Sequence, residues 1–591
     1  MALVVLCVLA YLPGLFSIPA VDRDESRFAQ ASKQMLGSGT VRGWVVPMVG
    51  ETPRLNKPPV IYWLQAGSAA VGGVEAGEVP EPALAVPMEG RSFDRTGAIG
   101  WFRVPSAVCA AIAALCTWRI GLSMFGARHG RAAWLAGALL ATSLVVMWDA
   151  RQARADQLLM AVTTAAMWAL WECWREGTKA SSHRAIEWKS AVWMWVCIGL
   201  GVMSKGPITP MIAALTAATL CAATGRWRWL LSLRPIVGVL IVAACVAPWV
   251  ALVAREVGWG EYLRIIGDEV LGRSVSPSEG HWGPPGYHLV LLPLMFWPGS
   301  LLTAAGIVLA WKQSRRERVA VAGGVRAWLA RFSDERPGEL FLLAWLVPSW
   351  IVFELVSTKL PHYVMPLYPA LALVSARAVM LAGSGDEARR AMGLGKVGPR
   401  VGFALWCVLG LCVTVGVSIV FWRWGGLRAS AGTMMLAGTL IGASAGSMVV
   451  SAMALWRGGF VRAQCYGVAA MIIGAVVSFG IVLPRLHEPW VTARLAEIIE
   501  RADPRGEVAI GAVGYHEDSL KFMTDGRLSR LGLANVPEWL AARDGAIVVL
   551  PAGDFEETRV KVGRELEELG RTAGFNYSKG ERVELVVVRV R

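Results

Sequence analysis

Charged residues are few for a chain of this length. Asp, Glu, Lys and Arg make up 17% of the 591 residues, while 55% are hydrophobic. A soluble globular protein carries about 25% charged residues, so that class of protein is excluded. Intrinsic disorder is excluded as well, because 28 Trp and 16 Phe accompany long apolar runs. The composition predicts a polytopic α-helical membrane protein.

Cysteine is scarce outside the apolar runs. All ten Cys residues lie in such runs or at their edges, and the polar C-terminal segment contains none. An external disulfide framework is therefore excluded. No pair of cysteines has the spacing of a zinc-binding CxxC motif, so the sequence does not indicate a structural zinc site either.

Apolar runs long enough to cross a membrane are, by contrast, abundant. About 20 predominantly apolar residues in a helix span a hydrocarbon core of about 30 Å. Because the number of runs is odd, the two termini would lie on opposite sides of the membrane. We expect thirteen spans, at residues 1–19, 103–123, 131–149, 157–174, 190–204, 207–224, 235–254, 287–310, 339–357, 361–381, 401–422, 431–456 and 463–484.

The net charge of +14 follows the expected topology and does not gather in one binding patch. Lys and Arg concentrate in alternate connections between spans, among them residues 225–234 and 311–338. The positive-inside rule places these connections and the N-terminus in the cytoplasm. The basic excess is thus a topological signal, and we expect no nucleic-acid partner.

Three parts can be distinguished along the chain. Residues 1–485 form the predicted membrane domain, in which residues 20–102 are a long first loop on the outer side. Residues 486–591 are polar and predict a small external α/β domain. In this tail we expect a helix at Phe555–Leu569 and strands at Val508–Val513, Ala546–Leu550 and Glu584–Val590.

The first loop contains two predicted surface helices. The first, residues 22–36, begins with Asp22 and has Glu25 three residues later, which is the pattern of a capping box. The second, residues 58–64, is apolar and rich in aromatic residues but too short to span. We expect it to lie on the membrane surface, where aromatic side chains are favoured.

Ionisable residues gather at the outer ends of the spans. Taken singly, an Asp at a helix start is commonly a cap, and a Lys at a span end commonly reaches the lipid headgroups. Together on one side, they predict a site for an anionic lipid, in which cations hold a phosphate and a carboxylate acts as general base. The set comprises Asp24, Glu25, Arg27, Lys57, Asp149, Arg151, Arg154, Asp156, Lys205, His281, Lys359 and His362.

Two motifs within this set resemble those of a known family. Residues 24–29 (Asp-Glu-Ser-Arg-Phe-Ala) and 56–59 (Asn-Lys-Pro-Pro), followed by Tyr-Trp-Leu at 62–64, resemble the first-loop motifs of polyprenyl-phosphate-sugar-dependent glycosyltransferases with the GT-C fold. Residues 359–363 (Lys-Leu-Pro-His-Tyr) resemble their later Lys-Leu-Pro-x-Tyr motif. The likeness is greatest to the aminoarabinose transferases of lipid A and to bacterial relatives of protein O-mannosyltransferases. It covers essentially the whole membrane domain.

The resemblance implies an integral-membrane glycosyltransferase. Its donor would be a sugar linked to undecaprenyl phosphate, and its acceptor would be lipid A, another envelope glycolipid or a protein, with inversion at the sugar. The resemblance further implies a bacterial inner-membrane location, with the active face and the C-terminal domain in the periplasm. Membrane lipids would surround the spans.

The resemblance also implies the roles of individual residues. Asp24 matches the catalytic carboxylate of the first loop, and Asp156 falls where a second acid is expected, with Asp149 as the alternative for that position. The residues implied to bind the donor phosphate or the substrate are Glu25, Arg27, Lys57, Arg154, Lys205, Lys359 and Tyr363.

A metal site is the point at which this sequence departs from the aminoarabinose transferases. His281 resembles a loop histidine that joins a glutamate in holding a metal there, but Asn56 occupies the position of the glutamate. A neutral amide is a poor zinc ligand compared with a carboxylate. We therefore expect that no cofactor is required, with His281 as the candidate ligand should a divalent metal bind. Phe28 also stands where that family usually has Tyr.

The alternative function is that of a transporter or flippase for a lipid-linked sugar. Such a protein needs ionisable residues along a pathway at the membrane midplane, commonly in broken helices. Interior charges are sparse here (Arg119 and Glu354), and the polar residues gather at one rim. This distribution favours the enzyme, and a purely structural subunit would leave the rim of acids and cations without a purpose.

Overall fold

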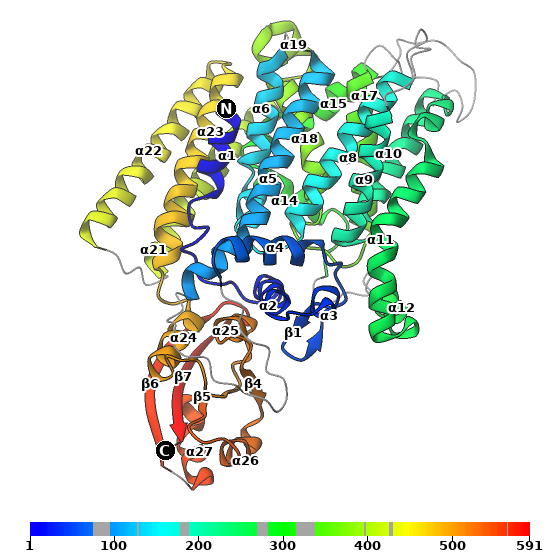
Figure 1. Ribbon diagram of the computed structural model, residues 1–591. Helices are drawn as coiled ribbons and strands as arrows, with labels where there is room; N and C mark the ends of the chain where they lie inside the picture. The colour runs from blue at the N-terminus through cyan, green and yellow to red at the C-terminus, as the bar shows by residue number, and fades with distance from the viewer. Residues whose placement is uncertain are drawn as a thin grey trace.

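The computed structural model describes residues 1–74, 95–126, 129–177, 188–268, 282–314, 337–394, 397–424, 430–563 and 565–590. These residues form a large helical bundle with a smaller domain of mixed strands and helices at one end (Figure 1). The N-terminus lies near the opposite end of the bundle from the C-terminal domain. The arrangement agrees with a multi-pass membrane domain followed by a polar α/β tail.

The bundle is built almost entirely from apolar helices. Their buried side chains form one continuous core, in which Ala and Gly allow close helix contacts and Trp, Phe and Leu fill the remaining space. The helices are α1 (Ala2–Tyr11), α5 (Arg95–Phe125), α6 (Gly130–Ala141), α7 (Leu144–Asp149), α8 (Asp156–Gly177), α9 (Trp188–Lys205), α10 (Ile208–Thr224), α11 (Pro235–Val257), α12 (Trp259–Gly267), α14 (Tyr287–Met295), α15 (Thr303–Ser314), α17 (Pro337–Leu355), α18 (Tyr368–Ser384), α19 (Asp386–Ala391), α20 (Val397–Leu411), α21 (Val417–Trp424), α22 (Ala431–Trp456) and α23 (Phe460–Ala475).

Among the described residues, seven helical segments are long and apolar enough to cross a membrane, which confirms a multi-span membrane protein. They cover Ala98–Phe125, Pro235–Val257, Pro337–Leu355, Met365–Ser384, Pro399–Val420, Ala431–Trp456 and Phe460–Arg485. The other six predicted spans also contain helices, but these are shorter, broken or less apolar, as α6 and α7 illustrate by their interruption at Thr142–Ser143. The count of thirteen spans therefore stays a prediction.

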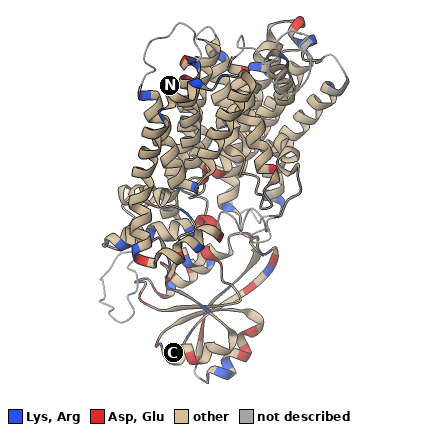
Figure 2. Ribbon diagram, turned by 90° about the vertical axis from the view of Figure 1, so that its right-hand side faces the viewer, with Lys and Arg blue, Asp and Glu red and all other residues tan. Residues whose placement is uncertain are grey.

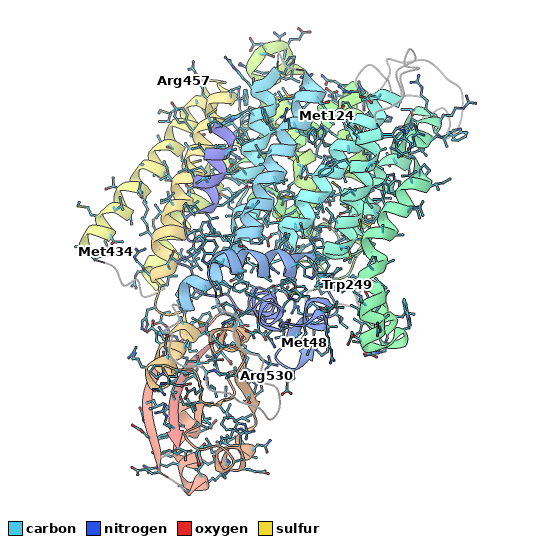
Figure 3. The ribbon with its side chains drawn as sticks, in the orientation of Figure 1. Met48, Met124, Trp249, Met434, Arg457 and Arg530 are labelled. Atoms are coloured by element: carbon cyan, nitrogen blue, oxygen red, sulfur yellow. The ribbon has the colours of Figure 1, made fainter. Side chains whose placement is uncertain are left out.

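Charged side chains are concentrated at the two ends of the bundle and over the C-terminal domain (Figure 2). Met124 and Arg457 mark the end far from that domain, whereas Met48 lies at the end near it and Arg530 lies in the domain itself (Figure 3). Of the described connections, those that contain or adjoin Met124 and Arg457, which the sequence assigns to the N-terminal side, thus share one end of the molecule. The first loop and the tail share the other end.

The first loop lies between the bundle and the C-terminal domain (Figure 1). It contains α2 (Asp24–Gly37), α3 (Val41–Val45), a short hairpin of β1 (Met48–Val49) and β2 (Thr52–Pro53), and α4 (Val60–Val71). Both predicted surface helices are therefore present, as α2 and α4.

The predicted capping box at the start of α2 is wrong. The Asp22 carboxylate accepts a hydrogen bond from Ser519 N at 2.9 Å, and so bonds the C-terminal domain instead of the first turn of its own helix. Glu25 Oε2 accepts a hydrogen bond from Val21 N at 2.8 Å. Both carboxylate oxygens of Glu25 also accept hydrogen bonds from the Arg103 guanidinium. Tertiary partners have displaced the local pairing that the sequence pattern favours.

The C-terminal domain is a mixed five-stranded sheet with the order β4-β3-β5-β7-β6. Strands β4, β3 and β5 are parallel, and β7 pairs antiparallel with both β5 and β6. The strands are β3 (Ile510–Val513), β4 (Leu528–Leu531), β5 (Ile547–Pro551), β6 (Leu566–Asn576) and β7 (Glu581–Val590), and the helices are α24 (Val491–Ala502), α25 (Asp518–Met523), α26 (Val536–Ala541) and α27 (Phe555–Val562).

The three predicted strands of the tail are confirmed as β3, β5 and β7, but the predicted helix at residues 555–569 is half wrong. Helix α27 ends at Val562, where Gly563 takes a left-handed φ of 61°. Leu566 then begins strand β6, which pairs with β7 along its length. The charged residues of this segment suit an exposed helix or an edge strand equally, and pairing with β7 decides for the strand.

Candidate active site

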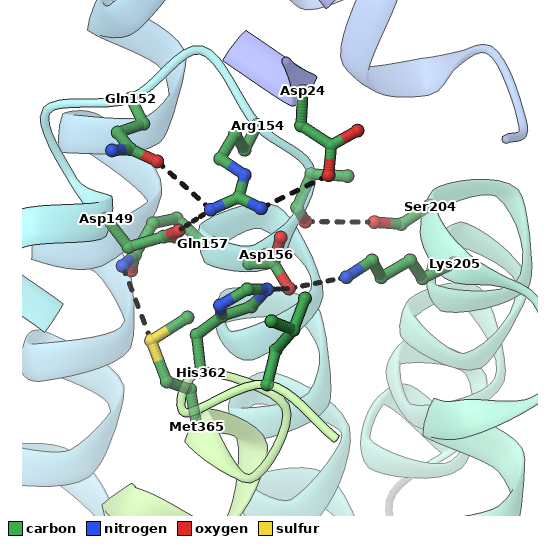
Figure 4. Close-up of polar contacts among 12 residues, drawn as sticks. Asp24, Asp149, Gln152, Arg154, Asp156, Gln157, Ser204, Lys205, His362 and Met365 are labelled. Carbon is green, nitrogen blue, oxygen red and sulfur yellow. Dashed lines mark hydrogen bonds and ion pairs between the residues drawn. The ribbon is translucent and has the colours of Figure 1, made fainter. Parts of the chain in front are cut away.

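Five separate segments converge at the end of the bundle that faces the first loop. They are the start of α2, the segment between β2 and α4, the turn between α7 and α8, the C-terminal end of α9, and the turn between α17 and α18. Figure 4 shows the polar contacts around Asp24, Arg154 and Asp156. The side chains that the five segments bring together are Asp24, Arg54, Arg154, Asp156, Lys205 and His362. Membrane and first-loop segments far apart in the sequence thus form one cluster of acids and cations.

Asp24 lies at the accessible edge of this cluster. Its carboxylate forms ion pairs with Arg54 (Oδ1 to Nη2, 3.1 Å) and Arg154 (Oδ2 to Nη2, 3.2 Å). The Asp24 side chain is 42% exposed, whereas those of Arg54 and Arg154 are 10% and 14% exposed. Burial alone would raise the pKa of the Asp24 carboxyl, but Arg154, Arg54 and Lys205 together hold it well below its ordinary value. Asp24 is therefore an ionised and reachable carboxylate.

Arg54 is a site residue that the sequence interpretation missed. Its guanidinium receives support from Tyr62, whose hydroxyl accepts from Nε at 3.1 Å, and it lies 4.7 Å from the centre of the Phe28 ring. Phe28 and Tyr62 stack on each other at 5.1 Å. The sequence feature that could have indicated Arg54 is its position two residues before the Asn56-Lys57 motif. Position in sequence, however, does not show which carboxylate an arginine will contact.

Arg154 links Asp24 to a deeper acid. Its Nη1 lies 3.7 Å from Asp149 Oδ1 and donates to Gln152 Oε1 at 3.0 Å. Asp149 is 1% exposed, so it can reach substrate only through Arg154 or after a rearrangement. The position of Asp149 favours Asp156 as the second acid of the site, although Asp156 is buried as well.

Asp156 is held between two cationic or titratable groups. Its Oδ1 accepts from Lys205 Nζ at 2.5 Å and lies 3.7 Å from His362 Nε2. Lys205 also lies 5.2 Å from the centre of the Tyr363 ring. Lys205, Tyr363 and Arg154 are thus in the cluster as predicted. His362 belongs to the predicted set of outer ionisable residues, but no individual role was predicted for it. Because Asp156 is buried and pairs with Lys205, it is better placed to orient that lysine than to abstract a proton.

Three predicted substrate contacts lie elsewhere. Glu25 is 1% exposed and pairs with Arg103 at 2.8 Å from both of its oxygens, while its Oε1 also accepts from Ala153 N at 3.0 Å. Glu25 therefore ties α2 to α5 and to the turn that carries Arg154. Arg27 points to the C-terminal domain, where its Nε contacts Asp518 Oδ2 at 2.7 Å.

Lys359 is likewise directed away from the cluster. Its Nζ donates to the carbonyls of Gly283 and Val356, each at 2.8 Å, and the residue is 4% exposed. Nearby, Glu354 accepts the backbone N–H groups of Gly286 and His288 at the start of α14. The interior Glu354 is therefore a helix cap, and Lys359 fixes the segment before α14.

Lys57 is half-buried beside Asn56, just before α4.

The residues present do not fit the metal site implied by the resemblance. Asn56 offers a neutral amide where that site has a carboxylate, and His281 lies outside the described residues. A neutral amide is a poorer ligand for a divalent cation than the carboxylate it replaces. The expectation that no metal is required stays a prediction.

Comparison with known proteins shows what the chain as a whole is similar to. Residues 99–251 match the family model described as dolichyl-phosphate-mannose-protein mannosyltransferase. The chain is 24% identical to the undecaprenyl phosphate-alpha-4-amino-4-deoxy-L-arabinose arabinosyl transferase of Pectobacterium atrosepticum, over 91% of this chain and 89% of that protein. It is 27% identical to the transferase of the same name from Edwardsiella ictaluri over 66% of its own length, and it spans 61% of that relative.

The fold extends the relationship to the whole molecule. The crystal structure of ArnT from Cupriavidus metallidurans bound to undecaprenyl phosphate superposes with a TM-score of 0.70, at 18% identity, over 99% of this chain and 96% of that chain. The chain is related to the GT-C glycosyltransferases. The predicted enzyme class is thereby confirmed, and the C-terminal domain belongs to the shared fold.

Proposed function

We propose that this GT-C relative transfers a sugar from an undecaprenyl-phosphate-linked donor to an acceptor, with Asp24 as the catalytic carboxylate. The observation that carries the proposal is the position of Asp24, a 42%-exposed carboxylate flanked by Arg54 and Arg154 at the bundle end. An ionised acid beside fixed cations suits the displacement of a lipid phosphate by an oxygen nucleophile.

The charge distribution fits each part of such a displacement. The acceptor oxygen attacks the anomeric carbon while the bond from that carbon to the phosphate oxygen breaks, and the bonding pair leaves with the phosphate. A lipid phosphate is a weak base, so its departure needs fixed positive charge more than a proton. Arg54, Arg154, Lys205 and Lys57 supply cations at this end of the bundle, and Asp24 would receive the proton of an acceptor hydroxyl. A single displacement inverts the anomeric centre.

The names of the relatives favour a particular donor. Both relatives are arabinosyl transferases whose donor name combines undecaprenyl phosphate with 4-amino-4-deoxy-L-arabinose. We extend that donor to this chain, with lipid A as acceptor. A phosphate group on lipid A would itself be the nucleophile, and Asp24 would then orient the acceptor instead of deprotonating it.

The topology proposed with this function has thirteen spans in a bacterial inner membrane. The N-terminus would be cytoplasmic, and the cluster and the C-terminal domain would face the periplasm. Support comes from the distribution of Lys and Arg among the connections and from the shared end of the first loop and the tail. A polyprenyl donor anchored in the outer leaflet could then present its phosphate to the cluster.

The decisive experiment is transfer by the purified protein in detergent or nanodiscs. Undecaprenyl-phosphate-linked 4-amino-4-deoxy-L-arabinose, offered with lipid A, should yield modified lipid A that mass spectrometry detects. Donors with other sugars and hydroxyl acceptors are tested in parallel to define the specificity. Absence of transfer from every lipid-linked donor, with folded protein, would overturn the proposal.

A further inference from the structure

Helix α2 is shared between the membrane domain and the C-terminal domain. On one face, Asp24 meets Arg54 and Arg154, and Glu25 meets Arg103. On the other face, Arg27 pairs with Asp518 of α25, and Lys33 pairs with Asp525 just after that helix. The helix that carries the proposed catalytic acid is therefore clamped between the membrane domain and a segment that lies nearly 500 residues after it in sequence.

The entry into α2 is bonded to the C-terminal domain even more closely. Asp22 N donates to the Tyr577 hydroxyl at 3.0 Å, and the Asp22 carboxylate accepts from Ser519 N at 2.9 Å. Arg23 donates from Nη2 to the carbonyl of Ser578 at 2.7 Å and from Nε to its hydroxyl at 3.2 Å. Tyr577 and Ser578 form the turn between β6 and β7. Both residues immediately before Asp24 are thus held by the tail.

The backbone at Arg23 has a conformation that needs such support. Arg23 has φ 64° and ψ −122°, a region that a residue with a side chain rarely adopts. Strain of this kind persists only where surrounding contacts over-determine the backbone, and it commonly occurs beside functional residues. The contacts that flank it here are those of Asp22 and Arg23 with residues 519, 577 and 578. They set the direction in which the chain enters α2, and with it the direction of the Asp24 side chain.

We propose that the C-terminal domain positions the catalytic carboxylate: its β6–β7 turn and the start of α25 hold Asp22 and Arg23 so that Asp24 lies between Arg54 and Arg154. The inference rests on the proposed function of Asp24. Tyr577, Ser578 and Asp518 are positioning residues in this account, since they act on Asp24 through the backbone and through Arg27. The domain would accordingly be required for turnover without touching the sugar.

The position of Asp24 explains why the contacts with the C-terminal domain affect its carboxylate. Asp24 is the first residue of α2, so a small change at Arg23 displaces its carboxylate directly. The opposing groups have supports other than Arg23, because Arg154 lies in the α7–α8 turn, Arg54 is held by Tyr62, and Lys205 and His362 come from α9 and the 358–363 turn. Loss of the C-terminal contacts would separate the carboxylate from cations that stay in place.

The test uses the full-length protein with Tyr577→Phe and Asp518→Asn. Each variant removes one contact to the α2 region, and Tyr577→Phe keeps the ring that packs 5.9 Å from Trp490. We expect kcat to fall by about 5- to 20-fold while the donor KM changes by less than about 2-fold, because a displaced catalytic group slows chemistry more than binding. The acidic limb of the kcat profile should move up towards pH 4–5, about the ordinary range of a carboxyl group, as Asp24 loses its cationic partners.

Matched controls come from the same domain. Arg530→Gln removes the second ion pair of Asp518 but leaves that of Arg27, and Lys561→Gln breaks an exposed pair on α27. Both should retain wild-type kcat and pH profile. Transfer by the wild-type protein, lost in Asp24→Asn, establishes the proposed function separately. Wild-type kcat in both test variants would overturn the positioning role, as would a loss of activity that matches the loss of folded protein with an unchanged pH profile.

Discussion

Asp24 combines accessibility with a strongly favoured charge, and its substitution tests the mechanism at the scale of one residue. Asp24→Asn keeps the size of the side chain but removes the negative charge between Arg54 and Arg154. We expect turnover to fall by about 10² or more, the effect of losing a general base, with expression and melting temperature near those of the wild type. Steady-state transfer with purified variant measures this. Near-normal transfer would mean that Asp24 serves only to pair the two arginines.

Of the three lysines predicted to bind phosphate or substrate, Lys205 and Lys359 differ in position, and their variants should differ accordingly. Lys205 lies in the cluster, where it donates a hydrogen bond to Asp156. Lys359 donates to the carbonyls of Gly283 and Val356. Lys205→Ala should cost about 2–4 kcal/mol in transfer, as expected for a charge-assisted contact shielded from water. Lys359→Ala should instead lower the melting temperature and leave the donor KM within about 2-fold, since it removes hydrogen bonds to backbone.

Equal losses of transfer for Lys205→Ala and Lys359→Ala, without loss of stability, would contradict this assignment. The exposed Lys561 on α27 provides a control variant, because its partner Glu557 lies on the same surface helix. Lys33 is unsuitable as a control, since it is buried and pairs with Asp525.

The substitution of a glutamate by Asn56 predicts transfer without a divalent metal. We expect purified protein that has been dialysed against EDTA to keep its transfer rate within about 2-fold, because a neutral amide binds such ions poorly. Metal content is measured in parallel by mass spectrometry. Loss of activity on chelation, with recovery on adding back one ion, would contradict the prediction and would point to His281.

At the scale of elements, the junction between α2 and α25 should respond to pH through Asp22. Burial, with smaller contributions from Glu517 and Asp518, raises the pKa of the Asp22 carboxyl to about 6, against the lowering effect of Ser519. A raised pKa means that the folded state binds the proton more tightly than the unfolded state. The stability contributed by Asp22 is therefore fully present below about pH 4 and is lost as pH rises through about 6.

The variant Asp22→Asn isolates this effect. Asn stays neutral and keeps a carbonyl oxygen that can accept from Ser519 N. We expect it to exceed the wild type in stability by about 1–2 kcal/mol at pH 7, with the difference vanishing near pH 4. Thermal unfolding followed between pH 4 and 8 measures both curves. A difference independent of pH would assign the effect to packing.

At the scale of the whole molecule, the position of the cluster requires that the tail and the basic connections lie on opposite sides of the membrane. We expect the 225–234 and 311–338 connections to be cytoplasmic and the 486–591 tail to be external. In a background without native cysteines, Lys561→Cys should react with an impermeant thiol reagent in cells with a permeabilised outer membrane. Arg226→Cys should react only after lysis. The reverse pattern would place the cluster in the cytoplasm, out of reach of a donor in the outer leaflet.

The whole fold also shows where a local pattern was sufficient and where it failed. Periodicity located α2, α4 and three strands of the tail, because amphipathic order reflects which side of an element is buried. It failed after Val562, where strand β6 forms by pairing with β7, a partner that no local pattern identifies.

The sequence by itself determined the class of protein and the chemistry it could support. Apolar length and the placement of Lys and Arg require membrane helices. The outer acids and cations predict a site for an anionic lipid, and the first-loop motif resembles that of lipid-phosphate-dependent glycosyltransferases. These properties depend on residue type and order alone, so they can be read without coordinates.

Only the tertiary structure decided which ionisable side chains meet. In the fold, Arg54 and His362 lie in the cluster. Glu25 instead pairs with Arg103, and Arg27 pairs with Asp518. Pairing of charges depends on distances between segments that are remote in sequence, and the free energy of burying a charge requires that it find a partner wherever the fold offers one. For the same reason, only the folded chain showed that residues at its C-terminal end hold the two residues before Asp24.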